Sequence, residues 1–358
     1  MQLPTATPVR KESFCAARHK LLPKTMKKLL RKLTGSALDS KPEGTWKGRR
    51  VFAVDGCKVN LQPREELIDA FGLPKKAHCP QILVSAMLDV VAGVPVDVEL
   101  SGYRGNEREH LIAMLAGVAP GSLVILDRGY PSYEVIRMLT DAGIDFLIRV
   151  CEDSSFKATR SLKENQTHET NAWLDCEAFR KAGASPIPVR LVELEGPNGT
   201  SSSYVTSLLP NEFDRGDIKE LYHLRWSIEE FYKQLKGDYV GQGQFRSRTA
   251  QGVEQEVYTA ILFLALSRLV THSAKLKLGD SGQLEDGARL TQKASVLVLQ
   301  VWLTRLFLAE SRPRASEVLR SILAKASRVR DRSPRDRHFP RRSKNPRLRW
   351  SIYGGRNA

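Results

Sequence analysis

The sequence predicts an α/β protein built on a mixed β-sheet that is flanked by helices, and two observations support this fold class. Between residues 50 and 150, three strand-like runs are followed by a helix, a strand, a second helix and a further strand. After residue 214 a helical period returns, behind a polar stretch that shows no clear period. With 358 residues, the chain can cover a sizeable core without disulfide bonds.

The first three strands are expected at residues 51–61, 81–91 and 94–100. Residues 51–61 are rich in β-branched and apolar side chains, and Asp55 interrupts this run. The other two runs are separated only by Ala92-Gly93, which predicts a hairpin. The chain therefore opens with three strands, and the first of them carries an acidic residue.

A short helix and a central strand are expected next. Asn106 is a good N-cap, and the apolar residues behind it predict a helix over about residues 107–117. Residues 122–126 form a continuous apolar run, as expected for a strand that is covered on both faces. Asp127 follows directly at the carboxyl end of that strand.

A second helix and a fifth strand complete this part of the chain. Pro131 can open the helix at its first turn, and Gly143 is a good terminator. Residues 146–148 then predict a strand. Three antiparallel strands followed by helix, strand, helix and strand is the order of the ribonuclease-H-like fold, a mixed sheet with helices on both faces.

The rest of the chain divides by composition. A polar segment broken by Pro186 and Pro188 is interpreted as a small β-rich insertion with a few short strands. Long helices are expected at 214–236 and 251–273, a further helix at 296–308, and an Arg-rich, disordered end from Ser327. The predicted parts are a basic N-terminal segment (1–50), a first core part (51–150), the insertion (151–207), a second core part (208–273) and a C-terminal helical and Arg-rich region (274–358).

Positive charge is concentrated at the two ends. The chain has 56 Lys and Arg against 40 Asp and Glu, an excess of 16. Residues 1–50 hold thirteen of these cations and three acids, and residues 311–358 hold fifteen and three. A mildly acidic body between two basic arms favours binding of a nucleic-acid backbone. The alternative is that both ends are merely solvated tails.

Cysteine usage and hydropathy indicate a cytoplasmic protein. The five cysteines are far apart, with no Cys-x-x-Cys pair and no His at zinc spacing. The uninterrupted apolar runs fall short of the roughly 18 residues of a membrane span, and no charged-then-apolar leader opens the chain.

Residues 221–236 are the most informative stretch. One stripe of apolar side chains repeats at three and four residues and must face a core: Leu221, Leu224, Ile228, Phe231 and Leu235. A neighbouring stripe, within about 60° on a continuous helix, carries Tyr222, Arg225, Glu229 and Lys236. Alternatively this is an ordinary amphipathic helix, in which Arg225 and Glu229 form a pair worth only about 0.3–0.5 kcal/mol.

Three carboxylates are expected to meet at one rim of the sheet. Asp55 and Asp127 lie on strands that are neighbours in the predicted fold, and they repel each other unless a cation sits between them. With Glu229 they could hold two Mg²⁺ or Mn²⁺ ions about 3.5–4 Å apart. Asp89 and Glu230 compete for these roles, but Glu230 is rotated about 100° away from the Tyr222 stripe.

These residues carry a family resemblance. Tyr222, Arg225, Glu229 and Lys236 have the spacing of the Tyr-Arg-Glu-Lys signature, and this region resembles bacterial insertion-sequence transposases of the DDE class, specifically the insertion-sequence-four group. The segments Asp127-Arg128-Gly129-Tyr130 and Val54-Asp55-Gly56 are similar to those that carry the second and first Asp of that family. The resemblance covers about residues 50–270.

The resemblance implies a function and roles for the matching residues. Asp55, Asp127 and Glu229 would bind two Mg²⁺ (or Mn²⁺) ions and catalyse DNA cleavage and strand transfer, while Tyr222, Arg225, Lys236 and Arg128 would contact DNA. It also implies that the partners are transposon terminal inverted repeats and target DNA, bound by a homodimer in a synaptic complex. Some relatives stack a flipped base on a Trp of the insertion; Trp173 is a candidate here, although a buried core Trp is the preferred interpretation.

Two departures from the family are visible, and two rival functions remain. Cys57 stands where the family often has a small hydroxyl residue, and only 54 residues precede Asp55, fewer than relatives usually have. A shortened or inactive DNA-binding derivative would bind without cutting. A structure-specific nuclease on the same fold would cut without strand transfer.

Overall fold

The protein, seen in a computed structural model, is organised around one large β-sheet. The structure describes residues 10–38, 44–151, 162, 167–181, 183, 185–196, 200–239, 245–280, 289–328 and 330–331. The strands of the sheet are β1 (Val51–Asn60), β2 (Gln81–Asp89), β3 (Val94–Gly102), β4 (Leu123–Leu126), β5 (Asp145–Val150), β6 (Glu169–Leu174), β7 (Ile187–Glu195) and β8 (Ser201–Thr206). Their order is β3-β2-β1-β4-β5-β8-β7-β6.

The sheet is mixed, as the sequence predicts. Strands β1, β4 and β5 run parallel to one another, and every other pair of neighbouring strands in this sheet is antiparallel. Strands β2 and β3 form the expected hairpin, and Gly93 in its turn has a φ of +70°, which favours glycine. The short β4 is fully buried, consistent with its continuous apolar run.

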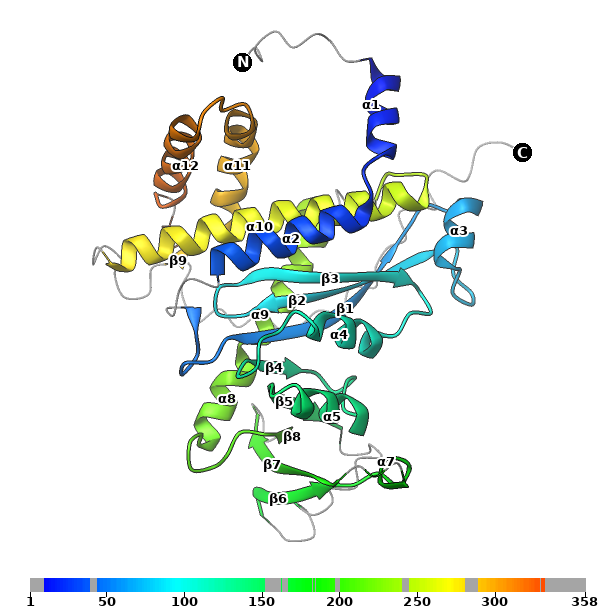
Figure 1. Cartoon of the computed structure of the whole chain (residues 1–358), viewed down its shortest axis with the longest axis vertical. Coiled ribbons are helices and arrows are strands. Elements are labelled where there is room, and N and C mark those ends of the chain that lie inside the picture. The colour runs from blue at the N-terminus through cyan, green and yellow to red at the C-terminus, as the bar shows by residue number, and fades with distance from the viewer. Residues whose placement is uncertain are drawn as a thin grey trace.

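Helices cover both faces of the sheet (Figure 1). On one side, α4 (Glu107–Leu115) and α5 (Tyr133–Asp141) pack against the even-numbered side chains of β1 and β4. On the other side lie α9 (Trp226–Gln234) and the long α10 (Ala250–Asp280), whose apolar residues share one core with the odd-numbered side chains of β1. Asn106 caps α4 as predicted, accepting a bond from the Arg108 amide.

Part of the basic N-terminal segment is docked on the body. Helix α1 (Lys11–His19) leads into α2 (Pro23–Leu38), which runs beside α10 and along the edge strand β3 (Figure 1). Met26 and Leu30 are buried in the core. The Arg31 guanidinium lies 2.5 Å from the carboxylate of Asp97 on β3. At least one cation of this segment, Arg31, is therefore engaged in an intramolecular ion pair.

The predicted helix over 214–236 is broken in two. Helix α8 (Arg215–His223) is followed by α9, and a π-helical turn, η4 (Leu235–Tyr239), continues α9. At the break, the amides of Leu224 and Arg225 bond three residues back, and the Ser227 hydroxyl donates to the Leu224 carbonyl at 2.8 Å. A side chain that captures a helical carbonyl in this way competes with the regular ladder, which explains the interruption.

Other parts of the chain also differ from the expectation. Residues 151–207 contribute β6, β7 and β8, which extend the central sheet through pairing of β8 with β5. Five helices of the described residues were not anticipated: α1, α2, α3 (Glu65–Phe71), α7 (Glu177–Lys181) and α12 (Arg312–Ala326). The predicted C-terminal helix is α11 (Gln292–Phe307), and a short ladder pairs β9 (Arg289–Leu290) with β10 (Arg330–Asp331). The predicted disorder beyond Ser327 concerns mainly residues 329 and 332–358, which lie outside the described residues.

Helix α10 contains a longer apolar segment than the sequence analysis expected. Its segment Ala250–Leu278 has the length and composition of a membrane span, but 67% of its apolar window is buried inside the protein. It packs against α2, α11 and the sheet. We therefore interpret α10 as a core helix.

The α9–sheet contact should dominate stability in this region. Phe231 is fully buried on α9, with the Arg268 guanidinium 5.5 Å from its ring. We expect Phe231→Ala to reduce the free energy of unfolding by about 3–5 kcal/mol, since it leaves a large cavity. The matched control is Phe307→Ala on α11, where the ring is 75% exposed and we expect a change within about 0.5 kcal/mol. Urea unfolding would measure both, and equal losses would contradict the packing described here.

Candidate active site

Asp55 and Asp127 lie near each other, at the point where two parallel strands separate. Strand β1 pairs with β4 through Val51 with Leu123 and Ala53 with Ile125, and the ladder ends there. Asp55 lies two residues beyond this ladder on β1, and Asp127 directly follows the last residue of β4. Adjacent strands lie about 4.8 Å apart, and the charge of Asp127 acts on Asp55, so the two carboxylates are neighbours at this rim.

The end of β4 exposes this pair to solvent. Strand β4 stops at Leu126, whereas β1 continues to Asn60, so the sheet opens beside Asp55. Each carboxylate is tied to its own loop or strand: Asp55 Oδ1 accepts from the Gly56 amide at 2.9 Å, and Asp127 Oδ1 accepts from the Gly129 amide at 2.7 Å. These bonds fix both side chains at the rim.

Desolvation and like charge act on Asp55. Burial raises the pKa of Asp55 from 3.8 to about 6, and the charge of Asp127 adds to this effect. The Gly56 amide and the Arg225 guanidinium oppose it. A carboxylate with such a pKa is held in an environment that favours binding of a cation.

Arg225 connects Asp55 to Glu229. Its Nη2 lies 2.5 Å from Glu229 Oε1, and its Nη1 lies 3.9 Å from Asp55 Oδ2. The guanidinium also lies 5.7 Å from the centre of the Tyr222 ring, and its buried Nε has no hydrogen-bond partner among the described residues. The Arg225 guanidinium thus lies between Asp55 and Glu229.

Tyr222 and Lys236 join this rim despite the helix break. The Tyr222 ring packs edge-on against Tyr204 of β8, with 4.6 Å between the centroids. Lys236, in η4, lies beside the Cys57 thiol, where its hydrogen bond and charge oppose the rise in the pKa of Cys57 that burial causes. Arg128 is exposed next to Asp127. The seven residues to which the family resemblance gives catalytic or DNA-binding roles therefore lie on or beside the rim at the end of β4.

The competing carboxylates have other partners. Asp89 is buried, accepts the Ala92 amide and pairs with Arg50 at 3.2 Å, which is a structural turn contact. Glu230 is exposed and accepts from the Trp226 indole, 3.0 Å away, and from Lys233. Neither faces Asp55, which supports the choice of Glu229.

The sequence analysis missed two residues at this site. The buried Tyr232, on α9, donates to the carbonyl of Asp55 at 2.7 Å and accepts the Ala86 amide at 3.0 Å, so it ties the helix to β1 at the aspartate itself. Glu107, the first residue of α4, lies against Gly56 and within 3.4 Å of the Tyr130 hydroxyl. Its pKa is raised by burial and by the charge of Asp127.

The carboxylates suit a hard divalent cation in chemistry, although they do not form a closed cage. Asp55 and Asp127 present oxygen ligands side by side, which are the ligands of Mg²⁺ and Mn²⁺. Within the described parts of the chain, no three Asp, Glu, His or Cys side chains are grouped closely enough to hold a metal. Arg225, between Asp55 and Glu229, accounts for this spacing.

Trp173 lies away from this rim, and the preferred interpretation of it as a core residue was wrong. Its side chain is 69% exposed on β6. It lines a cavity with Gly143, Asp145 and Leu209, at the amino end of β5. Asp127 follows the carboxyl end of β4, which runs parallel to β5. Trp173 and Asp127 therefore lie at opposite ends of these parallel strands.

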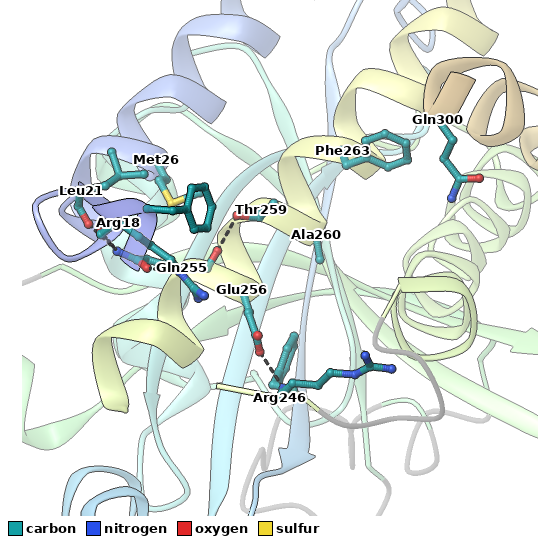
Figure 2. A pocket seen from close by; sticks show the side chains of 12 residues that line it. Arg18, Leu21, Met26, Arg246, Gln255, Glu256, Thr259, Ala260, Phe263 and Gln300 are labelled. Carbon is teal, nitrogen blue, oxygen red and sulfur yellow. Dashed lines mark hydrogen bonds between the residues drawn. The ribbon is translucent and has the colours of Figure 1, made fainter. Parts of the chain in front are cut away.

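A separate cavity of about 690 Å³ lies between α1, α2 and α10 (Figure 2). Its polar groups already pair with one another: Arg18 donates to Gln255 at 2.8 Å, and Glu256 accepts the Arg246 amide at 2.8 Å. Figure 2 shows Glu256 turned toward Arg246 and away from Gln255. The described residues that line this cavity belong mainly to packed helices, and among them Glu256 is the one carboxylate.

The fold and the paired aspartates are features of a class of DNA-processing enzymes, and comparison with known proteins identifies that class. Residues 46–266 match the family described as "Transposase DDE domain". The chain therefore belongs to the DDE transposase family.

Two individual proteins are similar to the chain. The transposase InsG for insertion sequence element IS4 of Escherichia coli (strain K12) is 21% identical over 339 residues, covering 91% of this chain and 74% of that protein. A piggyBac transposase, solved by cryo-EM in a synaptic complex with hairpin DNA, gives a TM-score of 0.44 at 11% identity over 76% of this chain. The chain spans 57% of the length of that piggyBac protein.

The raised pKa of Asp55 predicts a pH-dependent cost in stability. Because its pKa is about 6 in the folded protein and 3.8 ordinarily, folding favours the protonated form. Stability without metal should therefore fall as the pH rises from about 4 to about 6. We expect Asp55→Asn, in EDTA, to stabilise the protein at pH 7.5 by about 1–3 kcal/mol, at about 1.4 kcal/mol per pKa unit, and to have little effect at pH 4. Thermal unfolding at both pH values measures this, and a variant that is equally or less stable at pH 7.5 would contradict it.

Proposed function

We propose that the protein is a transposase that cuts DNA at the ends of its element and joins those ends to target DNA. The observation that carries this proposal is the proximity of Asp55 and Asp127 at the end of β4, with Arg225 between Asp55 and Glu229. Family membership supports the class of reaction. The three carboxylates are proposed as the catalytic set.

Two Mg²⁺ or Mn²⁺ ions are the proposed cofactors, with Asp55, Asp127 and Glu229 as their ligands. When bound, such ions lower the pKa of an attacking water or hydroxyl and stabilise the leaving oxygen of a phosphodiester. Asp55 suits this role because it is desolvated yet 23% exposed at the side chain, and so remains accessible. Its carbonyl bond to Tyr232 keeps it in place.

Arg225, Tyr222, Lys236 and Arg128 are proposed as DNA contacts. Arg225 has a buried, unsatisfied Nε, and only its Nη atoms are engaged with carboxylates in the described structure. A DNA phosphate at the rim would give this guanidinium a second anionic partner and draw it away from Glu229. Lys236 and the exposed Arg128 flank the same rim. The Tyr-Arg-Glu-Lys spacing then reflects four side chains that act on one DNA end.

The fold supports the same proposal. The order β3-β2-β1-β4-β5, with β1, β4 and β5 parallel, agrees with a ribonuclease-H-like core. We propose that β6, β7 and β8 belong to an insertion that has joined this sheet. A homodimer that pairs two transposon ends in a synaptic complex, in the cytoplasm, completes the proposal.

A binding protein without catalysis is the second candidate. The ion pair between Arg225 and Glu229 favours it, because that pair keeps Glu229 away from the two aspartates. Such a derivative would bind DNA through the basic ends of the chain and leave it uncut.

The central prediction concerns DNA cleavage. Asp55→Asn, Asp127→Asn and Glu229→Gln should each lower Mg²⁺-dependent cutting of DNA that carries the element's inverted repeats by at least about a thousandfold, while DNA binding stays nearly unchanged. Glu230→Gln is the matched control, since that exposed neighbour faces Trp226 and Lys233, and it should cut normally. Gel assays would follow cutting and joining. A triad variant that still cuts would remove that residue from the set, cutting without joining would indicate a nuclease, and a wild type that binds without cutting would favour the second candidate.

The C-terminal charge makes a separate prediction about binding. Residues 332–358 contain nine Lys and Arg and one acid. If they bind the DNA backbone, deleting them should reduce the slope of log K against log salt, by about 0.9 for each phosphate that they neutralise. Fluorescence anisotropy over a salt series measures this slope. An unchanged slope would assign the region to a solvated tail.

A further inference from the structure

We propose that Arg64, Arg246 and Arg248 form an arginine cluster that binds the phosphate backbone of DNA at some distance from the rim. The cluster lies where the chain leaves β1 and where it enters α10. The inference rests on the proposed function, because it states where DNA that is cut at the rim continues over the protein. Neither the Asp-Asp-Glu set nor the Tyr-Arg-Glu-Lys residues include these arginines.

A single glutamine side chain brings the two segments of the cluster together. Gln62 Nε2 donates to the carbonyl of Arg246 at 2.9 Å, and its Oε1 accepts from Arg64 Nε at 3.3 Å. Arg248 follows two residues after Arg246, and all three arginines are exposed. Cations from segments that are far apart in the sequence are therefore gathered on one surface.

The loop that carries Arg246 is held firmly by its backbone. Glu256 Oε2 accepts from the amides of Arg246 and Ser247, at 2.8 and 3.1 Å. Arg18 Nη2 donates to the Ser247 hydroxyl at 3.0 Å and to the Gly252 carbonyl at 3.1 Å. Figure 2 shows the Arg246 side chain extending away from Glu256. The contacts that fix the loop thus leave its arginine side chain directed outward.

The positive charge of the cluster is not neutralised locally. In the part of the chain that the structure describes, no carboxylate pairs with these three guanidinium groups. Glu66 accepts the Ala250 amide at 3.3 Å, and Glu256 is likewise engaged with amides. The N-terminus of the 31-residue α10 adds partial positive charge beside Arg248. Like charges held together in this way repel one another and favour an anion, and a guanidinium fits phosphate with two parallel hydrogen bonds.

Strand β1 connects the cluster to the rim. Lys236 lies beside Cys57, two residues beyond Asp55. The backbone pairing of β1 continues to Leu61, directly before Gln62. Six residues at about 3.3 Å each separate Asp55 from Leu61 by about 20 Å, the length of about six base pairs of duplex. DNA that is bound at the rim and lies along this strand would therefore pass Lys236 and then reach the cluster.

The test measures binding of a fluorescein-labelled DNA duplex to the full-length protein in EDTA, by anisotropy over a salt series. We expect the double variant Arg246→Gln, Arg248→Gln to lower the slope of log K against log salt by about 1.8, which is about 0.9 for each phosphate released. The double variant Arg246→Lys, Arg248→Lys should retain most of the slope, since lysine also binds phosphate as a point charge.

The matched control is Arg180→Gln with Lys181→Gln on α7, which changes the charge by the same amount. These exposed cations pair with Asp175 and Glu177, at 3.0 and 2.9 Å, and should leave the slope nearly unchanged. An unchanged slope in the cluster variant, or an equal loss in the control, overturns the inference. Circular dichroism melts verify folding; should the double variant not fold, Arg64→Gln replaces it, with an expected loss of about 0.9.

A Mg²⁺-dependent cutting assay separates this inference from the proposed function. The cluster contacts the backbone away from the reacting phosphate, so the glutamine double variant should raise the KM for DNA about tenfold and leave kcat within about twofold. A wild type that binds without cutting contradicts the proposed function, and the salt slope still decides the inference. A wild type that cuts, with an unchanged slope in the variant, overturns the inference alone. A wild type that binds no DNA overturns both.

Discussion

The structure depends on one electrostatic constraint, the placement of two carboxylates side by side on parallel strands. Asp127 follows β4, the neighbour of the strand that carries Asp55, and burial together with the charge of Asp127 raises the pKa of Asp55 to about 6. Such an arrangement is unfavourable in an isolated fold, so the surrounding contacts must hold it. Tyr232 of α9 holds β1 in place at Asp55, since its hydroxyl donates to the Asp55 carbonyl and accepts from the Ala86 amide. The helix that carries Glu229 is thereby joined to the strand that carries Asp55.

Local sequence predicted most of the elements that build this rim. The continuous apolar run before Asp127 and the interrupted run around Asp55 identify two buried strands, because few other patterns place an acid at such positions. The eight-stranded mixed sheet and its flanking helices confirm the predicted α/β class. Glu229 was chosen from a helical stripe, and the structure places Arg225 between it and Asp55.

The parts that could not be predicted depend on tertiary contacts. The helix break at Leu224 leaves the 3.6-residue period intact on both sides, so periodicity alone cannot reveal it. Glu107 resembles any acidic residue in a first helical turn, where it is favoured by the helix dipole. Only the tertiary structure shows that α4 places the Glu107 carboxylate against Gly56. The exposure of Trp173 likewise follows from the position of β6 at the edge of the sheet.

The division of charge along the chain has a physical reason in this arrangement. The rim concentrates negative charge on Asp55, Asp127 and Glu107, and Arg225, Lys58 and Lys236 offset part of it. A negative rim repels DNA unless cations intervene. The basic excess of 16 lies mainly at the two ends of the chain, where it can attract the backbone without neutralising the carboxylates. Part of the N-terminal excess is nevertheless used internally, since Arg31 and Lys27 hold α2 to Asp97 and Glu99. The cations that remain to attract DNA are therefore fewer than the net charge implies.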